Sequence, residues 1–182
     1  MQIRLSAIVF LAMALAGSTV AAAMPNAGTI EWQRLVVSGA GLAVEMPGKA
    51  TKGDDLIIGG LRSVAYRLET GEIRGYSVRA EQMPQQQISD EGAEALFDDI
   101  RDGLLADGTV RAEWSLKPSE GVVGRAVIID SAVKSGPDSY TMVAHLYLRG
   151  EWLYQVVATV PRGGEHDPVA RRFLASARFF DK

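Results

Sequence analysis

Three long segments in the second half of the chain are apolar at consecutive positions rather than at every second one. They span residues 122–133, 140–148 and 152–160. Strands that are apolar on both faces lie in the middle of a sheet that is covered on both sides. Only Arg149-Gly150-Glu151 separates the last two segments, which is typical of a tight turn between antiparallel strands. These segments therefore predict the centre of a sheet with a covering layer on each face.

Five further segments predict strands that are shorter or apolar on one face only. They are residues 31–38, 42–46, 62–69, 74–82 and 110–117. The third of them shows the pattern well, because Val64, Tyr66 and Leu68 fall on one face while polar residues fall on the other. The polar stretch 49–55 predicts a loop between the early strands and the later ones.

Two segments follow the helical period instead. After Pro84, apolar residues recur three and four positions apart, which predicts an amphipathic helix that ends near Gly108. Its apolar residues are Ala93, Leu96, Phe97, Ile100 and Leu104. A second helix begins at Asp167-Pro168, an N-cap followed by proline at the first helical position, and extends to about Ala177.

The order of these elements is strands, helix, strands, helix, and most links between strands are of hairpin length. This order predicts an α+β fold: a central, mostly antiparallel sheet of about six to eight strands with two main helices packed on it. The apolar phase of each element also predicts which side chains form the core. The predicted core residues are Trp114, Leu116, Ile128, Leu146, Tyr154 and Phe173.

The N-terminus has the three regions of a secretory signal peptide. Arg4 supplies the positive charge, residues 5–16 are apolar, and Ala21-Ala22-Ala23 provides the small residues of a cleavage site. A membrane-spanning helix needs about 20 apolar residues, more than this run contains. We therefore expect a signal peptide over 1–23, cleavage after Ala23, a flexible lead-in over 24–30 and one α+β domain over 31–182. The mature chain is then periplasmic or secreted and has no membrane span.

The amino-acid composition excludes several classes of function. The chain has no cysteine, which excludes disulfides, thiol nucleophiles, thiolate metal sites and a cysteine-linked lipid. Beyond the signal peptide 18 basic residues face 22 acidic ones, a net charge of −4, because only Arg4 precedes the cleavage site. A weakly acidic chain is a poor match for nucleic acid or for anionic lipid, both of which select a basic face.

The strand and helix pattern resembles that of a known group of exported bacterial domains. The segments that carry the resemblance are 42–49, 140–143, 146–154 and 172–179. The opening LAVEMPGK and the ending RFLASARF are similar to the "VEFPGKP" and "FLxSF" of that group, with departures at Met46 and Ala177, where phenylalanine is usual. The group is similar to the PsbP and Mog-like α/β/α sandwich. The resemblance implies an antiparallel sheet between helical layers and a non-catalytic accessory or binding role, and it carries over no catalytic residue.

Two glycine-rich stretches invite ligand-binding interpretations, but turns explain both. Gly39-Ala40-Gly41 lacks the third glycine of a dinucleotide fingerprint, since Val44 stands in its place, and a strand rather than a helix follows. Gly163-Gly164 precedes a helix, yet Glu165 and Asp167 occupy the place that an anion would take. We expect a turn at the first and a capped loop at the second.

Residues of the usual catalytic kinds are scarce. The two histidines, His145 and His166, fit no metal-binding pattern, and we expect the first to be hydrogen-bonded in or beside the core and the second to be solvated. Glu94, Asp98 and Asp102 share one face of the first helix, which is typical of a solvated surface rather than a calcium site. We predict no cofactor and no metal ion. A serine triad could still assemble in space, because triads are not local in sequence.

These observations favour a non-enzymatic accessory or binding protein of the cell envelope. Its partner is another envelope protein or a small ligand. The alternatives are a binder of a small or lipidic molecule, held between the sheet and the helix over 93–104, and a hydrolase with a spatially assembled site. The residues proposed for a binding surface are His145, Tyr147 and Arg149, and Arg171-Arg172 form a second possible contact surface.

Overall fold

The computed structural model describes residues 30–58, 60–71, 74–84, 90–105, 108–132 and 139–181. Its helices are α1 Asp90–Leu105 and α2 Pro168–Ala175, with a 3-10 turn, η2, at Gly164–His166. Its strands are β1 Gln33–Val37, β2 Leu42–Met46, β3 Thr51–Lys52, β4 Leu56–Ile58, β5 Leu61–Glu69, β6 Gly75–Gln82, β7 Thr109–Ser119, β8 Val122–Ala132, β9 Ser139–Arg149, β10 Trp152–Pro161 and β11 Arg178–Phe179.

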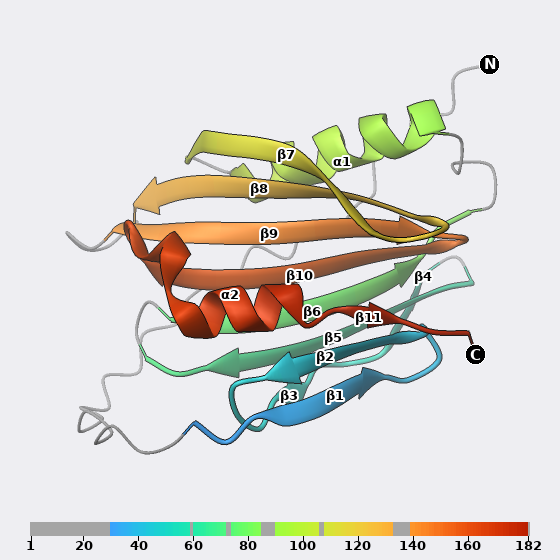
Figure 1. The fold of residues 1–182 in the computed structure, drawn as a ribbon. Coiled ribbons are helices and arrows are strands. Elements are labelled where there is room, and N and C mark those ends of the chain that lie inside the picture. The colour runs from blue at the N-terminus through green and yellow to red at the C-terminus, as the bar shows by residue number, and fades with distance from the viewer. Residues whose placement is uncertain are drawn as a thin grey trace.

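The strands form one large and one small antiparallel sheet (Figure 1). The large sheet has eight strands in the order β3-β5-β6-β10-β9-β8-β7, with β4 also paired to β5. The small sheet has the order β1-β2-β11 and so joins the two ends of the described chain. As predicted, β9 and β10 lie near the middle of the large sheet, and the hairpin between them turns at Gly150 with a φ of 54°.

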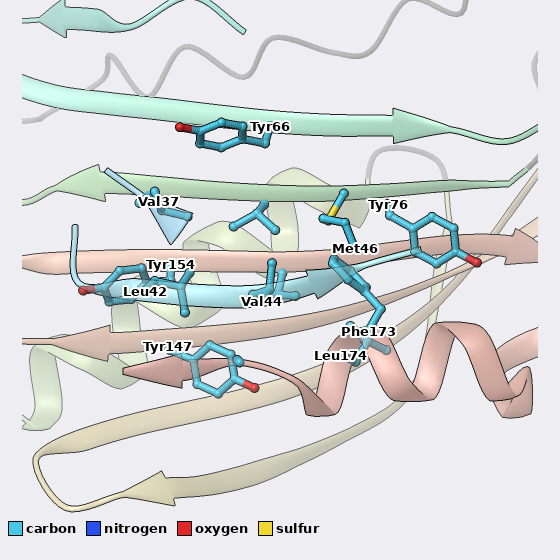
Figure 2. Close-up of a cluster of buried hydrophobic side chains, with 14 of the residues drawn as sticks. Val37, Leu42, Val44, Met46, Tyr66, Tyr76, Tyr147, Tyr154, Phe173 and Leu174 are labelled. Carbon is cyan, nitrogen blue, oxygen red and sulfur yellow. The ribbon is translucent and has the colours of Figure 1, made fainter. Parts of the chain in front are cut away.

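One face of the large sheet is covered by the small sheet and α2. Every second residue of β2, namely Leu42, Val44 and Met46, points into the core beneath (Figure 2). From α2, Phe173 enters the same core and meets Tyr76 edge-on, with 5.3 Å between ring centroids. Side chains from distant parts of the sequence therefore form one core.

The other face is covered only in part. Helix α1 packs on β9 and β10 through an apolar cluster, and the residues of that cluster are Ala93, Leu96, Phe97, Ile100, Ala144, Leu146, Leu148, Leu153 and Val157. On β5 and β6 the same face carries polar side chains instead. There Arg79 pairs with Glu81 and donates to the hydroxyl of Ser63. This part of the sheet needs no cover, because its polar groups interact with one another and with water.

The prediction of an α+β fold with helices packed as layers is therefore wrong. In the described chain 57% of residues lie in strands and 19% in helices, so the protein is mostly β. The layer on the core face is largely a three-stranded sheet, because the short segments predicted at 31–38 and 42–46 pair with each other and with β11 rather than extending the large sheet. Helix α2 adds only eight residues to that layer.

Three of the six predicted core residues are fully buried: Leu146, Tyr154 and Phe173. Leu116 and Ile128 are half-buried and pack against the edge of the core. Trp114 is 44% exposed, so its prediction is wrong. It lies on the apolar face, opposite Ala126, but β7 is the outermost strand. Alternation identifies which face of a strand is apolar; it does not say how far the covering layer extends.

The predicted start of α2 is confirmed. The carboxylate of Asp167 accepts hydrogen bonds from the backbone N–H groups of Val169 at 2.8 Å and Ala170 at 3.3 Å. It also forms an ion pair with Arg74, which connects the start of the helix to β6. Burial alone would raise the pKa of Asp167, but the hydrogen bonds from Arg74, Val169 and Ala170 together outweigh it, so the pKa lies below its usual range.

No helix in the described part of the chain has the length and apolar character needed to cross a membrane. The predicted signal peptide over 1–23 and nearly all of the predicted lead-in lie outside the described residues.

Candidate functional site

The outer face of the small sheet carries a set of arginines because of strand alternation. While Leu42, Val44 and Met46 point into the core, Glu45 points outward. Antiparallel pairing places Arg34 of β1 opposite Glu45. Residues opposite each other in a sheet share a face, so this arginine is also directed outward.

The same register places a second arginine on this face. Arg178 of β11 pairs with Ala43 of β2, two residues from Glu45. Helix α2 runs beside the sheet and contributes Arg172. Together they line a groove of about 480 Å³, which we call the arginine groove. Its lining residues are Arg34, Ala43, Val44, Glu45, Arg172, Ala175, Ser176 and Arg178.

The three guanidinium groups of the arginine groove differ in what they already bind. Arg172 donates through Nε to Glu45 Oε2 at 2.8 Å, and its guanidinium stacks on the ring of Trp32 at 4.1 Å. Arg178 donates only to backbone, to the carbonyls of Ala175 at 2.9 Å and Ala177 at 2.8 Å. Among the described residues, neither Arg34 nor Arg178 has a carboxylate partner. The groove thus holds three cations against one anion.

The hydroxyl in the groove is already used for structure. Ser176 Oγ accepts a hydrogen bond from the backbone N–H of Glu45 at 2.8 Å and donates to the carbonyl of Phe173 at 2.6 Å. This pair of bonds joins the end of α2 to β2 and occupies the hydroxyl both as acceptor and as donor. Guanidinium groups that face solvent, beside a hydroxyl that is engaged elsewhere, suit the binding of an anion rather than nucleophilic catalysis.

The predicted binding residues His145 and Tyr147 do not line this groove; they lie on the face of β9 that meets α2 and β11. They are neighbours on the core face of β9, with 3.1 Å between His145 Nδ1 and the hydroxyl oxygen of Tyr147. Burial lowers the pKa of His145 to about 4, against a smaller opposing effect from a hydrogen bond with the backbone of Leu174. Burial raises the pKa of Tyr147 to about 12. The expectation of a hydrogen-bonded histidine in or beside the core is confirmed.

Arg149, the third predicted binding residue, connects β9 to the end of the chain. Its Nη1 donates to the carbonyl of Phe180 at 2.8 Å, and its Nη2 pairs with Asp181 at 2.6 Å. The ring of Tyr147 meets Phe179 edge-on at 5.1 Å. These residues therefore support β11, the strand that carries Arg178. A direct role for them in binding stays a prediction.

Sequence reasoning identified only part of the groove. It named Arg172 as a possible contact residue but did not identify Arg34 and Arg178. The sequence does indicate that Arg34 points away from the core, because it is a charged residue within a predicted strand. The companion residues come from segments more than a hundred positions away, and only the pairing of β2 with β11 brings them together.

The acidic face of α1 is solvent-exposed, as predicted, but it is not merely solvated. Arg125 of β8 pairs with Glu94, with Asp98 at 2.6 Å and with Glu113 of β7 at 2.7 Å. Its hydrogen bond is the largest cause of the lowered pKa of Asp98. A second arginine, Arg101, pairs with Asp98 at 2.9 Å. This network attaches α1 to the edge of the large sheet.

The two glycine-rich stretches are turns, as predicted. Gly39 and Gly41 have φ values of 75° and 67°, and the strand β2 follows them directly. Gly163 has a φ of 79° and precedes η2. In that loop Glu165 pairs with Arg111 at 2.8 Å, while the side chain of His166 is exposed, as expected.

The alternative of a ligand held between the sheet and the first helix finds no support in the packing. Phe97 of α1 and Leu146 of β9 are both fully buried in the same apolar cluster. Side chains of the helix and the sheet therefore pack directly against each other in this cluster.

Comparisons with known proteins identify a similar fold and no function. No family model matches the sequence, and no curated protein matches it either. The structure is similar to the solution structure of cyanobacterial PsbP (CyanoP) from Synechocystis sp. PCC 6803, with a TM-score of 0.60. The match covers 88% of this chain and 99% of the other at 13% sequence identity. The predicted PsbP-like fold is therefore confirmed as a fold.

Proposed function

We propose that this chain is an exported, non-enzymatic accessory protein that binds another protein of the cell envelope through the arginine groove. The observation that carries the proposal is the groove's excess of cations on a chain whose mature net charge is −4: within the described part of the chain, Arg34 and Arg178 have no carboxylate partner. Local positive charge on an acidic protein favours an anionic ligand at that place and repels it elsewhere.

The titratable groups on the covered face of β9 and β10 agree with binding rather than catalysis. A general acid or base works best when its pKa lies near the working pH. His145 is neutral throughout that range because burial lowers its pKa to about 4. Tyr147 and Tyr154 are also neutral, since burial raises the pKa of each to about 12. The PsbP-like fold agrees with the accessory role that the resemblance implies.

Crosslinking in living cells tests this proposal. Val36 is 48% exposed and lies on the same outward face as Arg34, two residues away, so a photo-crosslinking residue there would touch a bound partner. Val123 is 41% exposed on β8 and serves as the matched control position. We expect one discrete protein adduct from position 36 and none of that mass from position 123. Identical adducts from both positions, or none from position 36, would contradict the proposal.

A further inference from the structure

Building on the proposed function, we propose that the arginine groove takes an extended acidic segment of the partner protein. One carboxylate of that segment binds Arg34 and a second binds Arg178, while Glu45 between them selects against compact anions such as phosphate. The inference rests on the spacing of Arg34 and Arg178, on the position of Glu45 and on the apolar surface around the groove.

The spacing favours a ligand with two separated charges. Arg34 on β1 and Arg178 on β11 flank β2 on opposite sides, so they lie two strand spacings apart. They are also offset by two residues, because one pairs with Glu45 and the other with Ala43. With about 4.8 Å between strands and about 3.4 Å per residue, their Cα atoms are about 12 Å apart. An extended peptide spans that distance in three to four residues.

Glu45 makes the middle of the groove unfavourable for a concentrated anion. It pairs with Arg172 at 2.8 Å and offsets the charge of that guanidinium. A phosphate placed between the two outer arginines would lie against this carboxylate and be repelled by it. Two carboxylates on an extended chain can bind the outer arginines on either side of it. Each such contact is a charge-assisted hydrogen bond, which a guanidinium fork can make with both carboxylate oxygens.

The surroundings of the groove match a polypeptide better than a membrane surface. Trp32 lies under Arg172, and Val36 and Phe180 are exposed beside the other two arginines. Apolar and aromatic groups next to arginine are typical of the sites where one protein binds another. A vesicle of anionic lipid would meet the acidic remainder of the mature chain as well as the groove.

Binding of a labelled peptide by the mature protein tests the inference. The probe is a fluorescent nonapeptide with two aspartates four residues apart, and its control carries asparagines at those positions. Arg34→Gln is the principal variant, because the side chain of Arg34 forms no hydrogen bond or ion pair with another described residue, and we expect it to weaken binding about tenfold. Glu45→Gln should tighten binding several-fold. Arg67→Gln is the matched control, since that side chain is 63% exposed and its one ion pair among the described residues is with Glu69.

Three results would overturn the inference. The first is equal loss of affinity in Arg34→Gln and Arg67→Gln, which would show attraction to net charge alone. The second is weaker binding in Glu45→Gln. The third is displacement of the peptide by millimolar inorganic phosphate or by vesicles rich in phosphatidylglycerol. If any of these occurs while the adduct at position 36 persists in cells, the acidic-segment inference fails and the proposed function stands. Loss of the adduct itself would refute the proposed function.

Discussion

The half-buried His145 predicts a specific loss of stability in mild acid. His145 has a pKa of about 4 in the folded protein, compared with an ordinary value of 6.5, because burial disfavours its charged form. Between these two values the unfolded chain binds a proton at this residue and the folded chain does not. The stability contributed by the neutral ring is therefore present in full above pH 6.5 and is lost as the pH falls toward 4.

The size of this effect follows from the difference between the two pKa values. One pKa unit corresponds to about 1.4 kcal/mol, so a difference of about 2.5 units corresponds to about 3 kcal/mol across the whole window. The carboxylates with lowered pKa values, including Asp167 and Glu165, contribute stability that is lost mainly below this window, as they become protonated. The slope between pH 6.5 and 4.5 therefore reports chiefly on His145.

Urea denaturation of the mature protein at half-unit steps from pH 4.5 to 7.5, followed by tryptophan fluorescence, measures that slope. His145→Gln removes the titrating group, so we expect a lower free energy of unfolding at pH 7 but little slope between pH 6.5 and 4.5. His166→Gln is the matched control, because the side chain of His166 is 84% exposed, and it should keep the slope of the parent. An unchanged slope in His145→Gln would refute the reasoning, as would its disappearance in His166→Gln.

Three further predictions concern the core, the helix cap and the N-terminus. Phe173→Ala should lower the free energy of unfolding by about 3–5 kcal/mol, because it leaves a cavity among fully buried side chains. Trp114→Ala should lower it much less, and chemical denaturation of the two variants measures the difference. Asp167→Ala should lower the free energy of unfolding by about 1–2 kcal/mol, because α2 loses its N-cap. Asp167→Asn should lower the free energy of unfolding less than Asp167→Ala does. N-terminal sequencing of the exported protein should find Met24 first, and a retained Met1 would contradict cleavage.

The features that could be predicted from sequence are those that local physics determines. Alternation in residues 62–69 and 74–82 is enough to identify two strands, because each exposes one polar face. Asp167-Pro168 marks the start of α2, since capping involves only the next two residues. The turn at Gly150 likewise depends on three adjacent residues. None of these signals says which element covers which face of the sheet.

The covering layer and the arginine groove both depend on a pairing that has no local signature. β2 is five residues long and apolar at most positions, which suits either sheet equally well. It pairs with β11 only because α2 returns the chain across the core, and the bond from the backbone of Glu45 to Ser176 spans 131 positions. Sequence order alone predicts that early strands extend the main sheet.

That same pairing explains why the arginines look unremarkable in the sequence. Arg34 is one polar residue of a strand in which exposed and covered positions alternate. Arg178 follows the C-terminal end of a helix, where a cation commonly interacts with the last backbone carbonyls. Only when β1 and β11 flank β2 do the two charges face solvent around a single glutamate. If the groove were only a consequence of packing, Glu45→Gln should cost stability and leave the binding of acidic peptides unchanged. A gain in affinity in that variant would instead identify Glu45 as a residue that limits what the groove accepts.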